Sequence, residues 1–164
     1  EHIVTNLTGV IAVCVALGVP AEDIKLYVRK LSSPPHRLQL TRRGDTAIID
    51  DAYNSNPAGC EAALKTLSLF EGIKILITPG MVELGSMQDE CNYAFGRSAA
   101  GVCDLVYLVG KKQTQAIHQG LKDAGYDENK ITVCESFMDA YNQASAVSGG
   151  QKIILIENDL PDNY

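Results

Sequence analysis

Three nearly continuous apolar runs, rich in β-branched residues, constrain the fold of this chain more than any other feature. They occupy residues 73–77 (IKILI), 105–109 (LVYLV) and 153–156 (IILI). Strands have this composition when they are buried on both faces, as in a parallel sheet that is covered by helices on each side. Segments with helical periodicity separate the runs. The pattern therefore predicts an α/β domain with a mostly parallel sheet between two helical layers.

The expected elements alternate along the chain. A hairpin with strands at 37–41 and 46–50, around a turn at 43–45, comes first. The later elements are listed here in order: helix 58–70, strand 73–78, helix 88–101, strand 104–109, helix 113–124, strand 131–134, helix 137–147 and strand 152–156. This succession is typical of a Rossmann-like, doubly wound three-layer domain.

The first thirty residues form a different region. Residues 6–17 carry apolar side chains at helical spacing, and a second helical pattern runs from 20 to 31. The segment 32–35 (SSPP) breaks the pattern and has the composition of a linker. We therefore expect a domain boundary here, with a helical segment and linker at 1–33 and the α/β domain at 34–164. The chain begins inside a helical pattern without an initiator Met, so we expect a piece of a longer protein.

One strand-to-helix junction is unusually polar. Residues 50–57 read DDAYNSNP, and they follow the apolar residues 47–49. Right-handed crossovers place the carboxyl ends of parallel strands at one edge of a sheet, which is where open α/β sheets bind their ligands. Two carboxylates and several amides suit hydroxyls, a metal ion or an ammonium group. The same residues also suit an Asx-rich turn that only caps the next helix, so both interpretations stay open.

Several other site types are not indicated. No GxGxxG follows a strand, and Gly110-Lys111 lacks the upstream glycine of a phosphate-binding loop because residue 105 is Leu. The net charge of −6 argues against a nucleic-acid surface, and no apolar run of 18 residues predicts a membrane span. The three histidines are dispersed. The five cysteines lack CxxC spacing, which favours neither a zinc site nor a redox dithiol and indicates a reducing, cytoplasmic compartment.

Several motifs together resemble the Mur ligases. Residues 35–39 (PHRLQ), the hairpin and the complete DD-x-Y-N-x-N-P at 50–57 resemble the start of the family's C-terminal domain, and residues 80–85 (GMVELG) resemble its G-x-M-x-E-L-G loop. His2 and Asn6 resemble the H-N-x-x-N pattern that closes the family's central ATPase domain, with Ile3 in place of the first Asn. Residues 157–164 differ from the K-G-S-R-type segment of the ligases, which leaves a Mur-ligase-like paralogue open.

The resemblance implies an ATP-dependent, amide-forming ligase of peptidoglycan precursor synthesis. The branch that it resembles most adds D-alanyl-D-alanine to UDP-N-acetylmuramoyl-tripeptide. In this family a carboxylate attacks the γ-phosphate of ATP, and an amine then attacks the resulting acyl phosphate. The phosphate-binding loop and the magnesium ligands belong to the central domain of the same chain. We therefore expect ATP and magnesium in the full-length enzyme, with no tight binding and no activity in this fragment.

The resemblance also implies partners and site residues. UDP-muramoyl-peptide and an amino acid or dipeptide are the expected substrates, and no catalytic residue or metal ligand is expected here. Arg37 has a guanidinium suited to phosphate or ribose oxygens, and Asp51 matches the family's ribose-binding acid. The other nucleotide-binding candidates are His2, Asn6, Tyr53, Asn54 and Asn56, and Glu83 is the candidate for the incoming ammonium. A nucleotide- or metabolite-binding module without ligase activity is the alternative.

Overall fold

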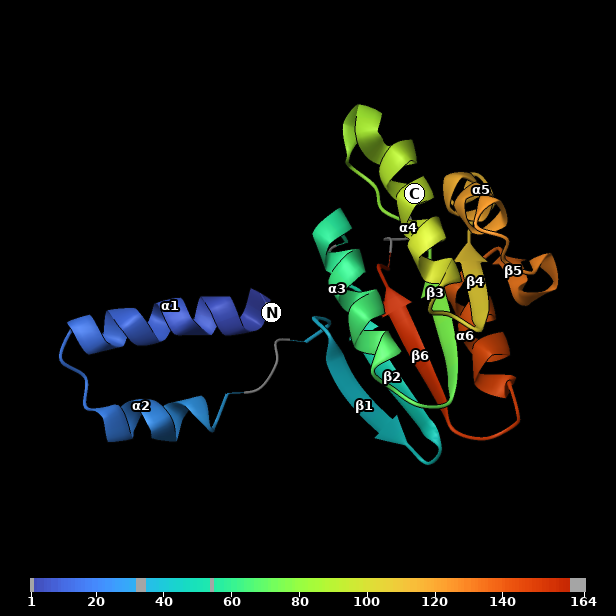
Figure 1. Cartoon of the computed structure of the whole chain (residues 1–164). Coiled ribbons are helices and arrows are strands. Elements are labelled where there is room, and N and C mark those ends of the chain that lie inside the picture. The colour runs from blue at the N-terminus through green and yellow to red at the C-terminus, as the bar shows by residue number, and fades with distance from the viewer. Residues whose placement is uncertain (1, 32–34, 54, 160–164) are drawn as a thin grey trace. The chain divides into compact units, whose positions relative to one another are not determined.

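A computed structural model describes residues 2–31, 35–53 and 55–159 of the chain (Figure 1). The side chains of His2 and Ile3 are outside this description, as are residues 32–34 of the expected linker. The chain divides into two compact units, residues 1–33 and residues 34–164. Each unit is described by itself below.

The first unit consists of two helices, α1 (His2–Ala16) and α2 (Ala21–Val28). Gly18 lies between them with a φ of 77°, a conformation that glycine adopts without steric cost. Pro20 directly precedes α2, where its fixed φ suits a helix start. Large apolar side chains of α1 are exposed, among them Val10 at 60% and Val15 at 61%. Within this unit, α1 therefore has an apolar surface that is not covered.

The second unit is a six-stranded sheet with the order β1-β2-β6-β3-β4-β5. Its strands are β1 (Gln39–Arg43), β2 (Thr46–Asp51), β3 (Ile73–Thr78), β4 (Leu105–Val109), β5 (Ile131–Cys134) and β6 (Lys152–Glu157). All neighbouring strands are parallel except β1 and β2. The predicted α/β fold with a mostly parallel sheet is thereby confirmed.

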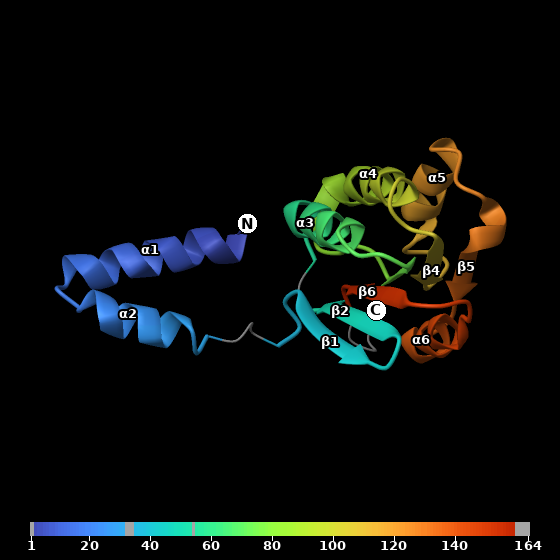
Figure 2. The same ribbon diagram turned by 60° about the horizontal axis from the view of Figure 1, so that its bottom comes forward.

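Helices cover both faces of this sheet. The helices are α3 (Pro57–Ser68), α4 (Gln88–Ala100), α5 (Gln115–Asp123) and α6 (Phe137–Ala146), with 3₁₀ turns η1 (Gly85–Met87) and η2 (Glu128–Lys130). Figure 2 shows α3, α4 and α5 on one face and α6 on the other. This arrangement follows from the connections, because α3, α4 and α5 lead outward to β3, β4 and β5, whereas α6 leads back to β6 at the centre.

The side chains of each central strand divide between two cores. Leu76 of β3 is buried with Leu64 and Leu67 of α3, whereas Ile75 is buried on the opposite face with Ala140 of α6. This division reflects the two-residue period of a strand. Since both faces of β3 are covered by protein, the strand is apolar at nearly every position.

The α4 and α5 helices pack closely because glycines face the contact. A Cβ atom added at Gly120 would lie 2.1 Å from the carbonyl oxygen of Tyr93, and one added at Gly96 would lie 2.2 Å from that of Ile117. Only a residue without a Cβ atom permits this approach of two backbones. The glycines thus set the separation of two helices on the same face of the sheet.

The expected hairpin is present, but its first strand is displaced by two residues. Strand β1 begins at Gln39 rather than at 37, because His36 and Leu38 have positive φ values of 58° and 48°. Positive φ lies outside the β region, so the chain cannot be extended there. The turn is also shorter than expected: Arg43 pairs with Thr46, and Gly44 has a φ of 58°.

Candidate functional site

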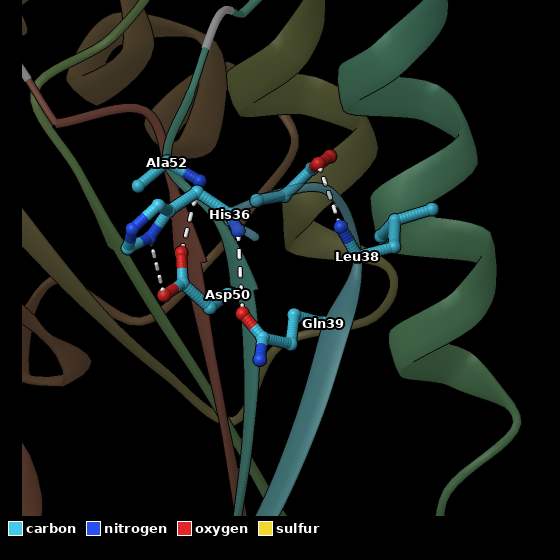
Figure 3. Close-up of polar contacts among 6 residues, drawn as sticks. His36, Leu38, Gln39, Asp50 and Ala52 are labelled. Carbon is cyan, nitrogen blue, oxygen red and sulfur yellow. Dashed lines mark hydrogen bonds and ion pairs between the residues drawn. The ribbon is translucent and has the colours of Figure 1, made fainter. Parts of the chain in front are cut away.

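The segment before β1 is attached to the end of β2. The Leu38 N–H donates to Oδ1 of Asp51 at 2.9 Å, and the Tyr53 N–H donates to the carbonyl oxygen of His36 at 3.2 Å. Figure 3 shows these segments side by side at the point where the strand ends. The positive φ of His36 and Leu38 turns the chain so that these contacts form. Two segments that flank the hairpin are therefore held together at one edge of the sheet.

Asp50 has a local role in this junction. Its Oδ2 lies 2.8 Å from Nδ1 of His36, and its Oδ1 accepts from the Ala52 N–H at 3.2 Å (Figure 3). The second bond closes an Asx turn directly after the strand. Both carboxylate oxygens of Asp50 thus bind protein groups, which agrees with a structural role in the turn.

Asp51 lies beside a second carboxyl group that is distant in sequence. In the parallel pairing of β2 with β6, Asp51 is the register partner of Glu157, so the two acidic residues stand side by side where the strands end. Burial raises the pKa of Asp51 above its ordinary value. Burial, followed by the negative charge of Asp51, raises the pKa of Glu157 to about 7. The two acids therefore form a coupled pair at the ends of adjacent strands.

Glu157 is 1% exposed and is held by two side chains from the start of α3. Its Oε1 accepts from Ser55 Oγ at 2.8 Å and from Cys60 Sγ at 3.3 Å, and Oγ and Sγ lie 3.0 Å apart. Burial and the nearby Glu157 charge raise the pKa of the Cys60 thiol, so the sulfur stays protonated and remains a donor. Among the described residues, no donor is directed at the buried Oε2.

Arg37 and Tyr53 contact each other on the exposed side of the same junction. The Arg37 guanidinium carbon lies 4.5 Å from the centre of the Tyr53 ring, within the range of a cation–π contact. Tyr53 is 66% exposed, and Arg37 is also exposed. The ring therefore restricts the guanidinium while leaving its N–H groups open to solvent or to an anion.

The loop after β3 is fixed by two buried asparagines. Asn92 of α4 accepts from the Met81 N–H and donates to the Met81 carbonyl, both at 2.8 Å. Asn158, which follows β6, donates to the carbonyl oxygen of Gly80 at 2.7 Å. Glu83 lies farther along this loop, is exposed and has a φ of 63°. The loop is thus ordered at its root, next to the end of β6.

The structure brings together only some of the candidate residues. Arg37, Asp51 and Tyr53 meet at the β2 junction, and Asn56 caps α3 by accepting from the Gly59 N–H at 3.0 Å. The remaining candidates lie elsewhere or outside the description. Glu83 belongs to the loop after β3, Asn6 is exposed on α1 of the first unit, and Asn54 and the side chain of His2 lie outside the described residues.

Sequence reasoning missed Glu157, Ser55, Cys60 and His36 as members of this site. Glu157 stands at a strand end, which is a usable signal, but its partner depends on which strand lies next to β2. Three acidic residues at the ends of two adjacent strands do not make a metal centre here. Within the ranges that the structure describes, no group of three or more His, Cys, Asp or Glu side chains is arranged to hold a metal ion.

A separate cavity of about 510 Å³ lies beyond β4, lined by Lys111, Lys112, Thr114, Gln115, His118 and Val133. In the sheet order, β6 and β3 separate β4 from β2, so this cavity is distinct from the Asp51 junction.

None of the helices in the described part of the chain is long and apolar enough to cross a membrane.

Comparison with known proteins identifies the family. Residues 36–157 match the family model described as Mur ligase, glutamate ligase domain. A UDP-N-acetylmuramoyl-tripeptide–D-alanyl-D-alanine ligase from Mycobacterium tuberculosis is 39% identical over 72 residues, which are 42% of this chain and 14% of that protein. The enzyme of the same name from Bacillus subtilis is 32% identical over 115 residues, 68% of this chain and 25% of that protein.

A crystal structure of MurF from Acinetobacter baumannii has the same fold. It superimposes with a TM-score of 0.84 and 26% identity, over 97% of this chain and 35% of that one. The chain spans between 14% and 26% of the length of the curated relatives named UDP-N-acetylmuramoyl-tripeptide–D-alanyl-D-alanine ligase that it matches. Because the family model matches most of its residues, this chain belongs to the Mur ligases and carries their glutamate ligase domain.

Proposed function

We propose that this chain is the C-terminal domain of an ATP-dependent ligase that joins D-alanyl-D-alanine to UDP-N-acetylmuramoyl-tripeptide. The names of its relatives and its membership of the family support this substrate assignment. The MurF ligase from Thermotoga maritima, whose fold is similar at a TM-score of 0.70 and 23% identity, was solved in complex with ADP. The reaction class is amide formation through an acyl phosphate.

The observation that carries the nucleotide role is the junction of Arg37, Tyr53 and Asp51. Arg37 is exposed, carries a permanent positive charge and is restrained 4.5 Å above the Tyr53 ring. Asp51 is bound through its Oδ1 to the adjacent Leu38 N–H. A fixed guanidinium suits phosphate or ribose oxygens, and a carboxylate accepts from vicinal hydroxyls. We assign this junction to one side of the ATP site, together with Asn56, and we keep Asn54 as a further candidate for nucleotide binding.

The first unit has the surface expected of a segment that packs on another domain. Val10, Val13 and Val15 on α1 are each at least 59% exposed. Apolar side chains that gather on one exposed helix mark a contact surface. We infer that residues 1–33 are the helical end and linker of the central ATPase domain. His2 and Asn6 then belong to the nucleotide site on that side, whereas Glu83 serves the incoming amine.

The described residues suit the nucleotide part of magnesium ATP but not the metal ion. They supply a guanidinium and a carboxylate for the nucleotide, but in the part of the chain that the structure describes no cluster suited to magnesium is present. We therefore assign the magnesium ligands and the phosphate-binding loop to the central domain of the full-length protein. The five free cysteines support a reducing, cytoplasmic location.

An amide-ligation assay of the full-length protein tests this function. The assay supplies ATP, UDP-N-acetylmuramoyl-tripeptide and D-alanyl-D-alanine, and it compares wild type with Arg37→Ala and with Arg42→Ala as a matched control. Arg42 is an exposed arginine on β1 of the same hairpin. We expect the KM for ATP to rise about tenfold or more in Arg37→Ala, because a hydrogen bond to a charged group contributes roughly 1.5–3 kcal/mol. Arg42→Ala should retain the wild-type KM.

Two results would redirect the assignment. Ligation of a different amine, with none of D-alanyl-D-alanine, would indicate a paralogue that acts on another substrate. Nucleotide binding without any ligation would favour the alternative, a nucleotide- or metabolite-binding module. Equal effects of Arg37→Ala and Arg42→Ala would remove the Arg37 contact from the proposed site.

A further inference from the structure

Glu157 has no role in the proposed function so far, yet it is the most buried charged side chain near Asp51. It ends β6 directly beside the end of β2 as the register partner of Asp51, and the negative charge of Asp51 acts on its carboxyl group. Its Oε1 receives two donors, Ser55 and Cys60, whereas Oε2 is buried and receives none from the described residues. The two oxygens of one carboxyl group thus have very different surroundings.

We propose that Glu157 is a positioning residue that keeps a proton on Oε2 and donates a hydrogen bond through it to the Asp51 carboxylate. This bond would hold Asp51 in place to accept from the Leu38 N–H. A protonated oxygen is a hydrogen-bond donor, so protonation gives the buried Oε2 a partner in Asp51. The pair then carries one negative charge instead of two. This role deepens the proposed function and rests on it, since Asp51 is the residue assigned to the nucleotide.

Electrostatics favours the single proton. Two carboxylates in contact cannot both ionise at low cost, particularly where one is buried. Arg37 lowers the pKa of Asp51 only weakly compared with burial, which raises it, because the guanidinium is exposed and stacked on Tyr53. The titratable and polar groups around the pair are Asp50 on β2, Arg37 and His36 before β1, and Ser55 and Cys60 at the start of α3.

Loss of the shared proton has a structural consequence. Above neutral pH, Glu157 and Asp51 become two adjacent negative charges and repel each other. Asp51 is only partly buried, whereas Glu157 is buried and bound by Ser55 and Cys60, so the repulsion is expected to displace Asp51. The contact from Asp51 to the Leu38 N–H therefore weakens as pH rises. The junction that presents Arg37 and Asp51 is then expected to be better ordered below pH 7 than above it.

Nuclear magnetic resonance of the 164-residue chain tests the shared proton directly. The carboxyl carbon of Glu157 and the amide of Leu38 are followed from pH 5 to pH 9 in wild type and in Glu157→Gln. Glutamine keeps the shape, accepts from Ser55 and Cys60, and donates permanently to Asp51. Glu135→Gln is the matched control, since Glu135 is an exposed acid that follows β5 at the same edge of the sheet.

In wild type and Glu135→Gln, we expect the Glu157 carbon and the Leu38 amide to titrate together near neutral pH. In Glu157→Gln, the Leu38 amide signal should stay constant. A Glu157 carbon that titrates below pH 5 in wild type would overturn the proposal, and this measurement needs no variant. A Leu38 titration that persists in Glu157→Gln would also overturn it.

The full-length enzyme supplies the functional readout. Between pH 6 and pH 8.5, the ratio of the wild-type KM for ATP to that of Glu157→Gln should rise several-fold. The pH dependence of kcat should be the same in both enzymes. A constant ratio of the two KM values would overturn the positioning role. If the carbon and amide titrate as expected while Asp51→Ala leaves the KM unchanged, the shared proton stands and the nucleotide assignment of Asp51 fails.

Discussion

The side-chain amide of Asn158 donates a 2.7 Å hydrogen bond to the carbonyl oxygen of Gly80, and it thereby joins the end of β6 to the loop after β3. Both residues have positive φ, 67° for Asn158 and 86° for Gly80. Asn158 is buried, so its amide is inaccessible to most of the solvent. Asparagine tolerates this backbone conformation better than other residues with a side chain, apart from aspartate. Asn158 therefore both supplies a donor to the Gly80 carbonyl and adopts the positive φ that the chain needs at this point.

Replacing Asn158 separates these two requirements. Asn158→Gly keeps the backbone conformation but leaves the Gly80 carbonyl without this donor, which is expected to lower the free energy of unfolding by about 1–3 kcal/mol. Asn158→Ala keeps a Cβ atom at positive φ without the amide that lets asparagine tolerate this conformation, so it should lose about 1–2 kcal/mol more than Asn158→Gly. Urea unfolding of the three chains should thus rank wild type above Asn158→Gly and Asn158→Ala lowest. Equal losses would mean that the positive φ imposes no strain.

Glu157 should make the stability of the chain fall as pH rises from about 4.5 to about 7. The Glu157 carboxyl has a pKa of about 7 when folded and about 4.5 when unfolded, because burial beside Asp51 disfavours its charge. Between these values the unfolded chain releases the proton and the folded chain keeps it, so stability is greatest at low pH and is lost toward pH 7. From pH 5 to pH 8 the loss from this group is about 2–3 kcal/mol.

Glu157→Gln isolates this effect from other titrations. The difference in unfolding free energy between the variant and wild type should increase from pH 5 to pH 8 in favour of the variant. Chemical denaturation at several pH values measures it. A difference that is independent of pH would show that Glu157 is ionised across this range.

Asn56 offers a test of capping against nucleotide binding. Its Oδ1 accepts from the Gly59 N–H and so caps α3, which leaves Nδ2 as a donor. Asn56→Ala should lower the free energy of unfolding by about 1 kcal/mol, whereas Asn56→Asp keeps the cap. Under the proposed nucleotide role, both variants should raise the KM for ATP in the full-length enzyme. An unchanged KM in Asn56→Asp would reduce Asn56 to a helix cap.

Tyr53 should act through its ring rather than its hydroxyl group. The ring restrains the Arg37 guanidinium, and a cation–π contact at an exposed site contributes about 0.5–1 kcal/mol. Tyr53→Phe should therefore retain the wild-type KM for ATP. Tyr53→Leu should raise the KM about two- to fivefold, while the melting temperature of both variants stays near that of wild type. A KM effect in Tyr53→Phe would instead assign the contact to the hydroxyl oxygen.

The sequence predicts the sheet well because each buried strand carries its own signal. The apolar runs at 73–77 and 153–156 fall within β3 and β6, and the strand expected at 131–134 coincides with β5. The start of β1 could not be predicted from the sequence, because His36 and Leu38 adopt positive φ although neither is a glycine. Their conformation depends on contacts with Asp50, Asp51 and Tyr53, which form only after the hairpin closes.

The partner of Asp51 was beyond sequence reasoning for a different reason. Asp51 and Glu157 are 106 positions apart, and they meet because β6 enters the sheet between β2 and β3. The order of elements along the chain does not state this insertion. Spacing alone also gives no indication that Ser55 and Cys60 reach the same carboxyl group. The junction at 50–57 could be located from its residues, whereas its buried acid required the strand order.

The attachment of residues 36–38 to the end of β2 has a mechanical consequence. The His36 carbonyl, the Leu38 amide and the His36 ring are each bound to a residue of the 50–53 segment. The polypeptide thus enters the α/β unit at the candidate site itself, rather than at a remote corner of the sheet. Tension or torsion that reaches the chain from the N-terminal side is therefore borne first by these three contacts.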